Sequence, residues 1–150
     1  MNAKLSLHAR ALGYLARREH SRQELEKKLS AYAPVPAELT ALLDELERQR
    51  LLSDERFVEQ MVYARRLKYG SKRIQHELRM KGIAEHLITA ALQDFKQTEV
   101  SSAHALLRKK FGASPADLKE RSRQIRFLAG KGFSSEAISR ALAHDREMEN

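Results

Sequence analysis

Apolar residues along this chain recur at intervals of three and four positions, which is the spacing of one face of an α-helix. One apolar stripe comprises Leu39, Leu42, Leu43 and Leu46. A second comprises Phe57, Met61, Ala64 and Leu67, and a third comprises Ile83, Leu87, Ile88, Ala91, Leu92 and Phe95. No stretch alternates apolar and polar residues between two turns, as a half-buried strand does. The pattern therefore predicts an all-α protein.

Side chains suited to helix ends stand beside these stripes. Ser21 and Glu24 form a capping box, in which the serine hydroxyl accepts from the Glu24 N–H and the glutamate reaches back. Ser53 precedes two acidic residues, which favour the positive end of a helix dipole. Gly82 and Gly132 stand where a left-handed residue would end a helix. The nine predicted helices lie near residues 4–18, 21–32, 36–50, 54–69, 72–81, 84–95, 99–111, 116–130 and 135–145.

The sequence KGIAEHLITAAL at 81–92 returns as KGFSSEAISRAL at 131–142. A period of about fifty residues indicates tandem supersecondary units rather than a single globule. The helices group in threes, and we predict an elongated crescent of three tandem three-helix repeats that span residues 1–51, 52–97 and 98–150. Because so small a unit cannot bury all of its apolar faces alone, we expect neighbouring repeats to stack.

The first repeat is a weaker copy of the other two. Leu25 and Leu29 occupy the positions of Ile74 and Leu78, but the segment SAYAPVPAEL at 30–39 replaces the Lys-Gly turn. We interpret the Lys-Gly turns mainly as architecture, in which a helix stops and a packing helix follows.

Composition narrows the class of protein. The 150 residues are 42% apolar and 32% charged and include no cysteine, so disulfides, thiolate metal sites and cysteine nucleophiles are excluded. No apolar run approaches the roughly 18 residues that a membrane span needs. The first residues do not have the pattern of a signal peptide, so we expect a cytoplasmic protein that makes no use of a membrane.

A search for catalytic chemistry finds no complete site in the sequence. The segment HELRM at 76–80 begins like a zinc-protease motif, but Met80 stands where the second histidine is needed. The segment GSKRI at 70–74 lacks the first glycine and the residue order of a phosphate-binding loop. The six histidines show no spacing typical of metal ligands. We therefore predict no enzyme, no cofactor and no metal.

Charge is the strongest remaining signal. The net charge is +8, and residues 65–82 and 106–132 each carry +6. Cations that recur with the repeat fit the regular phosphates of a nucleic acid, and arginine also pairs with acidic protein surfaces. The alternative is a solvated charged face without a partner. The candidate contact residues are Arg17, Arg18, Lys27, Lys28, Arg65, Arg66, Lys68, Lys72, Arg73, Arg79, Lys81, Lys109, Lys110, Arg121, Arg123, Arg126 and Lys131.

Three segments resemble the RecX family of bacterial modulators of the RecA recombinase. They are ALGYLARREHSRQELEKKL at 11–29, LLSDERFVEQMVYARRLKYGSKRIQHELRMKGI at 51–83 and RQIRFLAGKGFSSEAI at 123–138. The resemblance covers nearly the whole chain. It implies a crescent of three tandem three-helix repeats that binds RecA filaments on single-stranded DNA and lies along the deep filament groove. It also implies inhibition of ATP hydrolysis, strand exchange and co-protease activity.

The resemblance further implies binding to single- and double-stranded DNA with weaker affinity, and a role in DNA repair, homologous recombination and the SOS response. It transfers no catalytic residue. We therefore predict a monomeric cytoplasmic regulator that binds the RecA nucleoprotein filament. The residues alone leave two alternatives open, which are a DNA-binding module whose basic second helices clamp the backbone and a helical scaffold with neither property.

Overall fold

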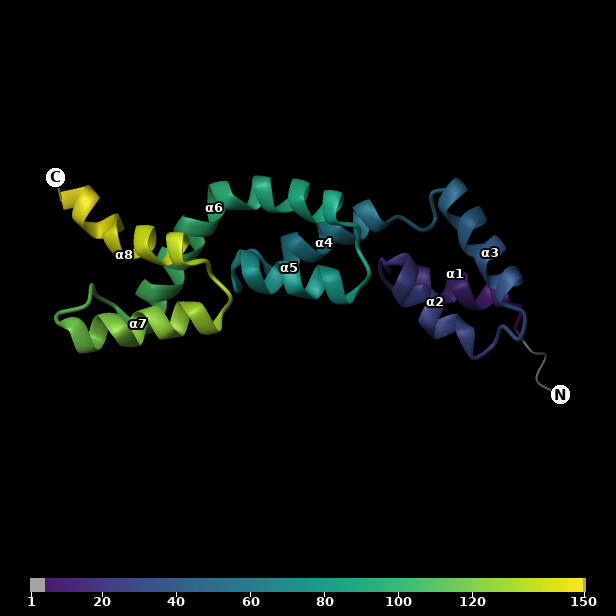
Figure 1. Cartoon of the computed structure of the whole chain (residues 1–150), viewed down its shortest axis with the longest axis horizontal. Coiled ribbons are helices and arrows are strands. Elements are labelled where there is room, and N and C mark those ends of the chain that lie inside the picture. Colours follow the sequence, from purple (N-terminus) through teal and green to yellow (C-terminus); the bar gives the residue numbers. More distant parts are fainter. Residues whose placement is uncertain (1–4, 150) are drawn as a thin grey trace.

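The computed structural model describes residues 5–149, which form eight α-helices and no strand. The helices are α1 Leu7–Arg17, α2 Arg22–Ser30, α3 Pro36–Arg48, α4 Asp54–Arg65, α5 Ser71–Met80, α6 Glu85–Phe111, α7 Leu118–Gly130 and α8 Ser135–Glu149. They form an elongated row, with α1, α2 and α3 at one end and α7 and α8 at the other (Figure 1). The prediction of an all-α, elongated repeat protein is confirmed. Residue 4, where the first predicted helix begins, lies outside the described residues.

The prediction of nine helices is wrong in one place. The segments predicted as separate helices at 84–95 and 99–111 are one continuous helix of 27 residues, α6. The residues between them, 96–98, contain neither proline nor glycine, so nothing interrupts the backbone hydrogen bonds there. The first half of α6 packs on α4 and α5, and its second half packs on α7 and α8. The second and third repeats therefore share one helix.

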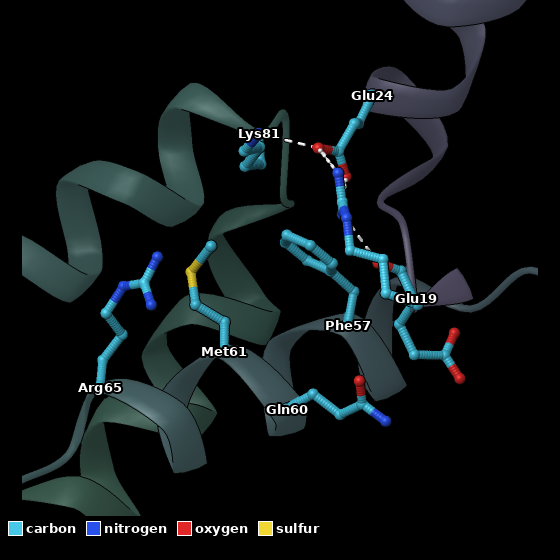
Figure 2. A pocket seen from close by; sticks show the side chains of 8 residues that line it. Glu19, Glu24, Phe57, Gln60, Met61, Arg65 and Lys81 are labelled. Carbon is cyan, nitrogen blue, oxygen red and sulfur yellow. Dashed lines mark hydrogen bonds and ion pairs between the residues drawn. The ribbon is translucent and has the colours of Figure 1, made fainter. Parts of the chain in front are cut away.

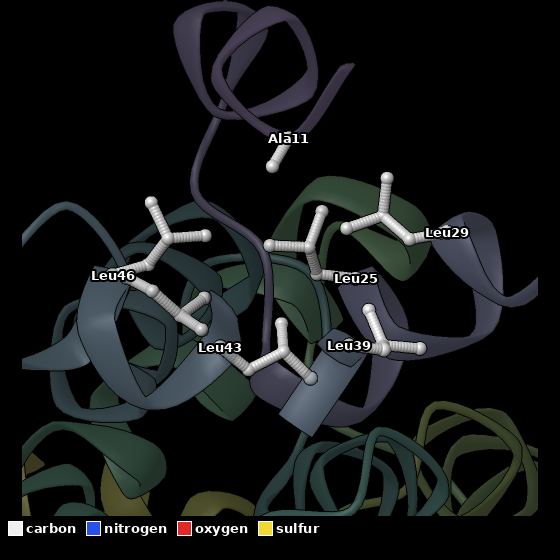
Figure 3. Packing of buried hydrophobic residues seen from close by; sticks show 7 residues of the cluster. Ala11, Leu25, Leu29, Leu39, Leu43 and Leu46 are labelled. Carbon is white, nitrogen blue, oxygen red and sulfur yellow. The ribbon is translucent and has the colours of Figure 1, made fainter. Parts of the chain in front are cut away.

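Each group of three helical segments has its own apolar core. In the first repeat, side chains from α1, α2 and α3 meet around Leu25, Leu43 and Leu46 (Figure 3). The buried core of the middle repeat comprises Phe57, Val58, Ile74, Leu78, Ile83, Ile88 and Phe95. That of the third comprises Ala103, Leu107, Leu128, Phe133, Ile138, Ala141 and Leu142.

The predicted apolar stripes agree with these cores except at the end of α4. Ala64 and Leu67 are exposed, and Val58 and Val62 face the core beside Phe57 instead. The helical period of 3.6 residues explains the difference, because positions 58 and 62 lie nearer to the centre of the packed face than position 64 does.

Half of the predicted capping box forms. The Ser21 hydroxyl accepts a hydrogen bond from the Glu24 N–H at 3.1 Å, and the Ser53 hydroxyl accepts one from the Arg56 N–H at 3.2 Å. The Glu24 carboxylate does not reach back to Ser21, however, because it binds Arg18 and Lys81 instead. Glu24 thus gives up a neutral backbone donor and gains two charged donors, whose hydrogen bonds to a carboxylate are stronger.

The first and second repeats meet where the N-terminus of α2 contacts the turn at Lys81 and Gly82, and we call this contact the first joint. The Ser21 hydroxyl donates to the Lys81 carbonyl oxygen at 2.8 Å. The Arg22 N–H donates to a carboxylate oxygen of Asp54 at 2.8 Å. Burial raises the pKa of the Asp54 carboxyl, although the hydrogen bond from Arg22 opposes this effect.

The second and third repeats meet in the same way at the N-terminus of α5, and we call this contact the second joint. The Gly70 N–H donates to the Lys131 carbonyl oxygen at 3.0 Å, and the Lys72 N–H donates to the Gly132 carbonyl oxygen at 2.9 Å. The second joint is thus held by backbone atoms, in addition to the shared helix α6.

A buried carboxylate completes the second joint. Glu99, which is 3% exposed, accepts from the Ser71 N–H at 3.0 Å and from the Ser71 hydroxyl at 2.8 Å. Asp54 has the same role at the first joint, because it accepts from the N–H of Arg22, the first residue of α2, just as Glu99 accepts from that of Ser71, the first residue of α5. Neighbouring repeats therefore stack as expected, but the contact is largely polar and the three apolar cores stay separate.

The two Lys-Gly turns are confirmed as helix stops. Gly82 and Gly132 have φ angles of 75° and 87°, a left-handed conformation that a residue with a Cβ atom rarely adopts. Space at the joints excludes a side chain as well, since a Cβ atom at Gly132 would overlap Arg73. The turns therefore also connect repeats, which the sequence pattern did not indicate.

Replacing Gly70 with alanine is expected to destabilise the protein by about 1–3 kcal/mol, the usual cost of forcing extra atoms into a close-packed contact. The φ of Gly70 is −93°, so alanine fits the backbone, but its Cβ atom would overlap the backbone of Gly132 and Phe133. Thermal unfolding followed by circular dichroism measures the effect.

The matched control is Gly13→Ala. Gly13 lies inside α1 and has open space around its Cα, so this change should stabilise the protein by about 0.5–1 kcal/mol. An unfolding temperature of the Gly70 variant at or above that of the wild type would contradict the close approach at the second joint.

Candidate functional site

The second helix of each repeat lies along one long edge of the molecule. In Figure 1, α7, α5 and α2 follow one another along the lower side of the row. We call the predicted contact residues on these helices the basic edge, which consists of Lys27, Lys28, Lys72, Arg73, Arg79, Arg121, Arg123 and Arg126. The other candidates lie at helix ends and turns that adjoin these helices, except Lys109 and Lys110, which lie at the end of α6.

Nearly half of the candidates are open cations. In the part of the chain that the structure describes, eight of them have exposed side chains and make no ion pair: Arg17, Lys27, Lys68, Lys72, Lys109, Lys110, Arg123 and Arg126. Charges of this kind are available to a phosphate polymer or an acidic surface. Arg121 and Lys28 are half-buried on the same edge.

Lys28 is held differently from its neighbour Lys27. Its ammonium nitrogen lies 2.8 Å from Nε2 of the buried His20 and 5.0 Å from the centre of the Tyr14 ring. Burial and, after it, the nearby positive charge of Arg18 lower the pKa of Lys28. Lys28 therefore contributes to the packing of the first repeat as well as to its charge.

Five candidates are already paired with carboxylates, one of which is Arg73, whose Nε atom lies 3.4 Å from Glu77. The Nε atom of Arg65 lies 2.8 Å from Glu77, and that of Arg79 lies 2.7 Å from Glu85. Arg18 and Lys81 share Glu24. The sequence predicted the positive charge of these residues, but it did not indicate which of them the chain neutralises itself.

Besides Lys28, three candidates lie against tyrosine rings. The guanidinium of Arg66 lies 3.9 Å from the centre of the Tyr63 ring, and that of Arg73 lies 3.9 Å from the centre of the Tyr69 ring. The Lys131 ammonium lies 5.7 Å from the same Tyr69 ring. Sequence reasoning missed both tyrosines, although a Tyr three or four positions before an Arg was a usable signal on a helix.

A cleft of about 330 Å³ opens beside the first joint. Its lining residues are Arg18, Glu19, Glu24, Phe57, Gln60, Met61, Arg65 and Lys81. Arg18 and Lys81 both bind Glu24 at one end of the cleft. Figure 2 shows Lys81 and Glu24 at this end, while Arg65 lies at the other end beyond Met61. Both the first and the middle repeat contribute to its wall, so the shape of the cleft depends on the relative position of these two repeats at the first joint.

Glu24 is the electrostatic centre of this cleft. Its two carboxylate oxygens accept from the Arg18 guanidinium at 2.9 and 2.8 Å, and the Lys81 ammonium lies 2.9 Å away. Burial raises the pKa of Glu24, but the hydrogen bonds from Arg18 and Lys81 outweigh it and lower the pKa to about 2. The carboxylate is therefore ionised at neutral pH and firmly bound. Sequence reasoning assigned Glu24 only to a capping box.

Among the residues that the structure describes, no group of three or more His, Asp or Glu side chains is arranged to hold a metal ion. The paired histidines His104 and His144, whose ring centres are 4.2 Å apart, lie between α6 and α8, away from the basic edge. The candidate contact surface consists of basic side chains and tyrosine rings.

Comparison with known proteins identifies the family. A family model for the second three-helix domain of RecX matches residues 53–92, and a model for the third matches residues 97–142. The regulatory protein RecX of Ralstonia pickettii is 45% identical over 144 residues, which cover 96% of this chain and 91% of that protein. The chain belongs to the RecX family. The resemblance inferred from the sequence is thereby confirmed.

Other RecX proteins agree in sequence and in fold. The regulatory protein RecX of Herbaspirillum seropedicae is 46% identical over 138 residues, covering 92% of this chain and 90% of that protein. The crystal structure of RecX from Lactobacillus salivarius has the same fold at 22% identity, with a TM-score of 0.82 over 92% of this chain and 93% of that one.

The regions matched by the RecX models each contain one Lys-Gly turn, at residues 81–82 and 131–132. The exact repeat boundaries at 1–51, 52–97 and 98–150 stay predictions. Within residues 5–149, none of the helices combines the length and the apolar character that crossing a bilayer requires.

Proposed function

We propose that this RecX-family chain binds the RecA filament on single-stranded DNA and inhibits its ATPase, strand-exchange and co-protease activities. The basic edge is the observation that carries the proposal. The second helices of three successive repeats follow one another in one row, and each carries basic residues. A row of this kind fits a partner that is itself extended and repetitive.

The mechanism is regulation by binding. A ligand shifts a conformational equilibrium only by the difference between its affinities for the two states. An elongated monomer that contacts neighbouring RecA subunits would favour the arrangement in which those contacts exist and oppose the rearrangement that hydrolysis and strand exchange need. The chain acts in the cytoplasm and needs no catalytic residue, metal or cofactor of its own for this.

The test is the ATPase rate of RecA on single-stranded DNA in the presence of the purified chain. We expect strong inhibition at near-stoichiometric ratios, because each bound molecule would constrain more than one subunit. Strand exchange and repressor cleavage by the filament should fall together with hydrolysis. Full activity of RecA at these ratios would rule out the proposal.

A second candidate function is binding to DNA without RecA. The stacks of Arg66 on Tyr63 and of Arg73 on Tyr69 favour it, since an aromatic face beside a cation suits single-stranded nucleic acid. A salt titration separates the two functions. Affinity for bare DNA should fall steeply with salt, whereas a filament regulator should bind tightly only when RecA is present.

A further inference from the structure

One charge on the basic edge has the opposite sign from its counterparts in the other repeats. In the second helix of the middle repeat, Arg73 stands directly before the buried Ile74, and in that of the third repeat Arg123 stands directly before the buried Gln124. In the first repeat the same position holds Glu24, directly before the buried Leu25. The first repeat therefore has a carboxylate where the other two repeats have a guanidinium.

The lysine of the Lys-Gly turn is equivalent at the two joints, but its surroundings differ. At the second joint, Lys131 and Arg73 both lie on the Tyr69 ring, and within the described residues no carboxylate pairs with Lys131. At the first joint, Lys81 is bound to Glu24. The same element of the repeat is thus open at one joint and neutralised at the other.

The geometry around Glu24 is that of an anion site. Arg18 presents two parallel N–H groups to the two carboxylate oxygens, and Lys81 adds a third donor from the neighbouring repeat. A guanidinium fork joined by an ammonium is also the arrangement that holds a phosphate group. Glu24 occupies the place of such a group.

The first joint is also the weaker of the two. The second joint has two backbone hydrogen bonds and the uninterrupted helix α6. Among the described residues, the first joint depends on side chains, and the connection from α3 to α4 at residues 49–53 is not helical. A few polar contacts hold it, and the apolar cores on its two sides each lie within one repeat.

We propose that the first joint is a binding site for a backbone phosphate of single-stranded DNA, which Glu24 closes in the free protein. The phosphate displaces Glu24 from Arg18 and Lys81 as the joint opens. Open cations continue on both sides, at Lys27 on α2 and Lys72 on α5, as a phosphate polymer requires. This inference rests on the DNA binding that is the second candidate function under the proposed function.

The floor of the cleft supports a nucleotide over an acidic peptide. Met61 and Phe57 lie between Lys81 and Arg65 (Figure 2), and Arg18 lines the same cleft. A nucleotide unit combines one negative charge with one flat aromatic base whose face can stack, whereas an acidic peptide has carboxylates without such a ring. The cleft volume of about 330 Å³ lies within the range of small-ligand sites.

The test compares Glu24→Gln with Glu26→Gln. Both changes raise the net charge equally, and Glu26 is an exposed neighbour on α2. Binding of fluorescein-labelled oligothymidylate, without RecA, is followed by anisotropy over a range of salt concentrations. We expect Glu24→Gln to bind roughly tenfold more tightly than Glu26→Gln. The slope of its log affinity against log salt concentration should be steeper by about 1.4, because Arg18 and Lys81, once released from Glu24, contribute about 0.7 each on single strands.

A second pair of variants, Arg18→Ala and Lys72→Ala, compares a cation that Glu24 holds with an open one. In the wild type, Arg18→Ala should change the affinity less than about twofold, since Glu24 already holds that side chain, whereas Lys72→Ala should weaken binding more. In the Glu24→Gln background, removing Arg18 and Lys81 should reverse the gain. Circular dichroism of every variant verifies that the helices are retained.

Several outcomes would overturn the inference. One is equal binding by the Glu24 and Glu26 variants, and another is a loss from Arg18→Ala as large as that from Lys72→Ala. A third is that Glu24→Gln gains as much affinity for a labelled polyglutamate peptide as for oligothymidylate, which would identify a site for protein carboxylates. Because RecA is absent from these measurements, a failure here is distinct from a failure of the proposed function, which the RecA ATPase reports.

Discussion

Ile88→Asp is expected to unfold the middle and third repeats while leaving the core of the first intact. Ile88 is fully buried in the core of the middle repeat, on the first half of α6. An unpaired carboxylate there lies among apolar side chains, and such changes cost about 3–5 kcal/mol. Since α6 also forms part of the third repeat, its loss removes support from α7 and α8.

Thermal unfolding and hydrogen exchange measure this effect. A loss of 3–5 kcal/mol corresponds to a fall in Tm of about 10 °C or more for a chain of this size. Protection of backbone amides should decrease in α4 to α8 and persist in α1, α2 and α3. Thr89→Asp, at an exposed neighbouring position on α6, is the matched control and should leave Tm nearly unchanged. A variant at position 88 with a Tm like that of the wild type would contradict the core described here.

Reversing two open charges on the basic edge, with Lys72→Glu and Arg123→Glu together, is expected to weaken inhibition of the RecA ATPase by roughly tenfold or more. Both side chains are exposed, and neither makes an ion pair within the described part of the chain. A glutamate at position 72 lies in the first turn of α5, where negative charge suits the helix dipole. Stability should therefore be retained.

The control reverses two charges away from the second helices. Lys96→Glu on α6 and Arg140→Glu on α8 change the net charge by the same amount, and both positions are exposed. The second change also removes a surface pair with Glu136, which costs little. Equal inhibition by the wild type and the Lys72/Arg123 variant, or equal losses in the two double variants, would show that the basic edge is only a solvated face.

Arg65 and Arg66 are poorer positions for the same experiment. Arg65 is bound to Glu77, so a glutamate there would face another carboxylate and disturb the contact between α4 and α5. Arg66 lies on the Tyr63 ring, so its replacement removes packing as well as charge. A loss of function from these changes would have two physical causes.

The sequence predicted the parts of the fold that depend on nearby residues. The stripe at Leu39, Leu43 and Leu46 and the stops at Gly82 and Gly132 follow from helical spacing and backbone sterics, and all of them appear in the structure. The prediction of a break between two helices near residue 97 was wrong. No residue between 95 and 99 stops a helix, yet the repeat pattern suggested a break there, and the continuous backbone hydrogen bonds of α6 prevailed.

The sequence could not predict the polar contacts at the two joints, because the residues that bind each other there are far apart along the chain. Glu24 and Lys81 are separated by 57 positions, and Ser71 and Glu99 by 28. Nothing local marks a carboxylate as the partner of a remote N–H group or ammonium. The composition therefore predicted which residues carry charge, but only the structure shows which charges, such as those of Lys72 and Arg123, are left for a partner.

The continuity of α6 restricts how the family can change in length. An α-helix turns by about 100° per residue, so one residue inserted near position 97 would rotate the whole third repeat by that angle about the helix axis. The second joint, with its paired backbone groups at Gly70 and Gly132, does not survive such a rotation. Insertions and deletions among relatives are therefore expected between α3 and α4, where a non-helical connection absorbs them, and not between residues 95 and 99.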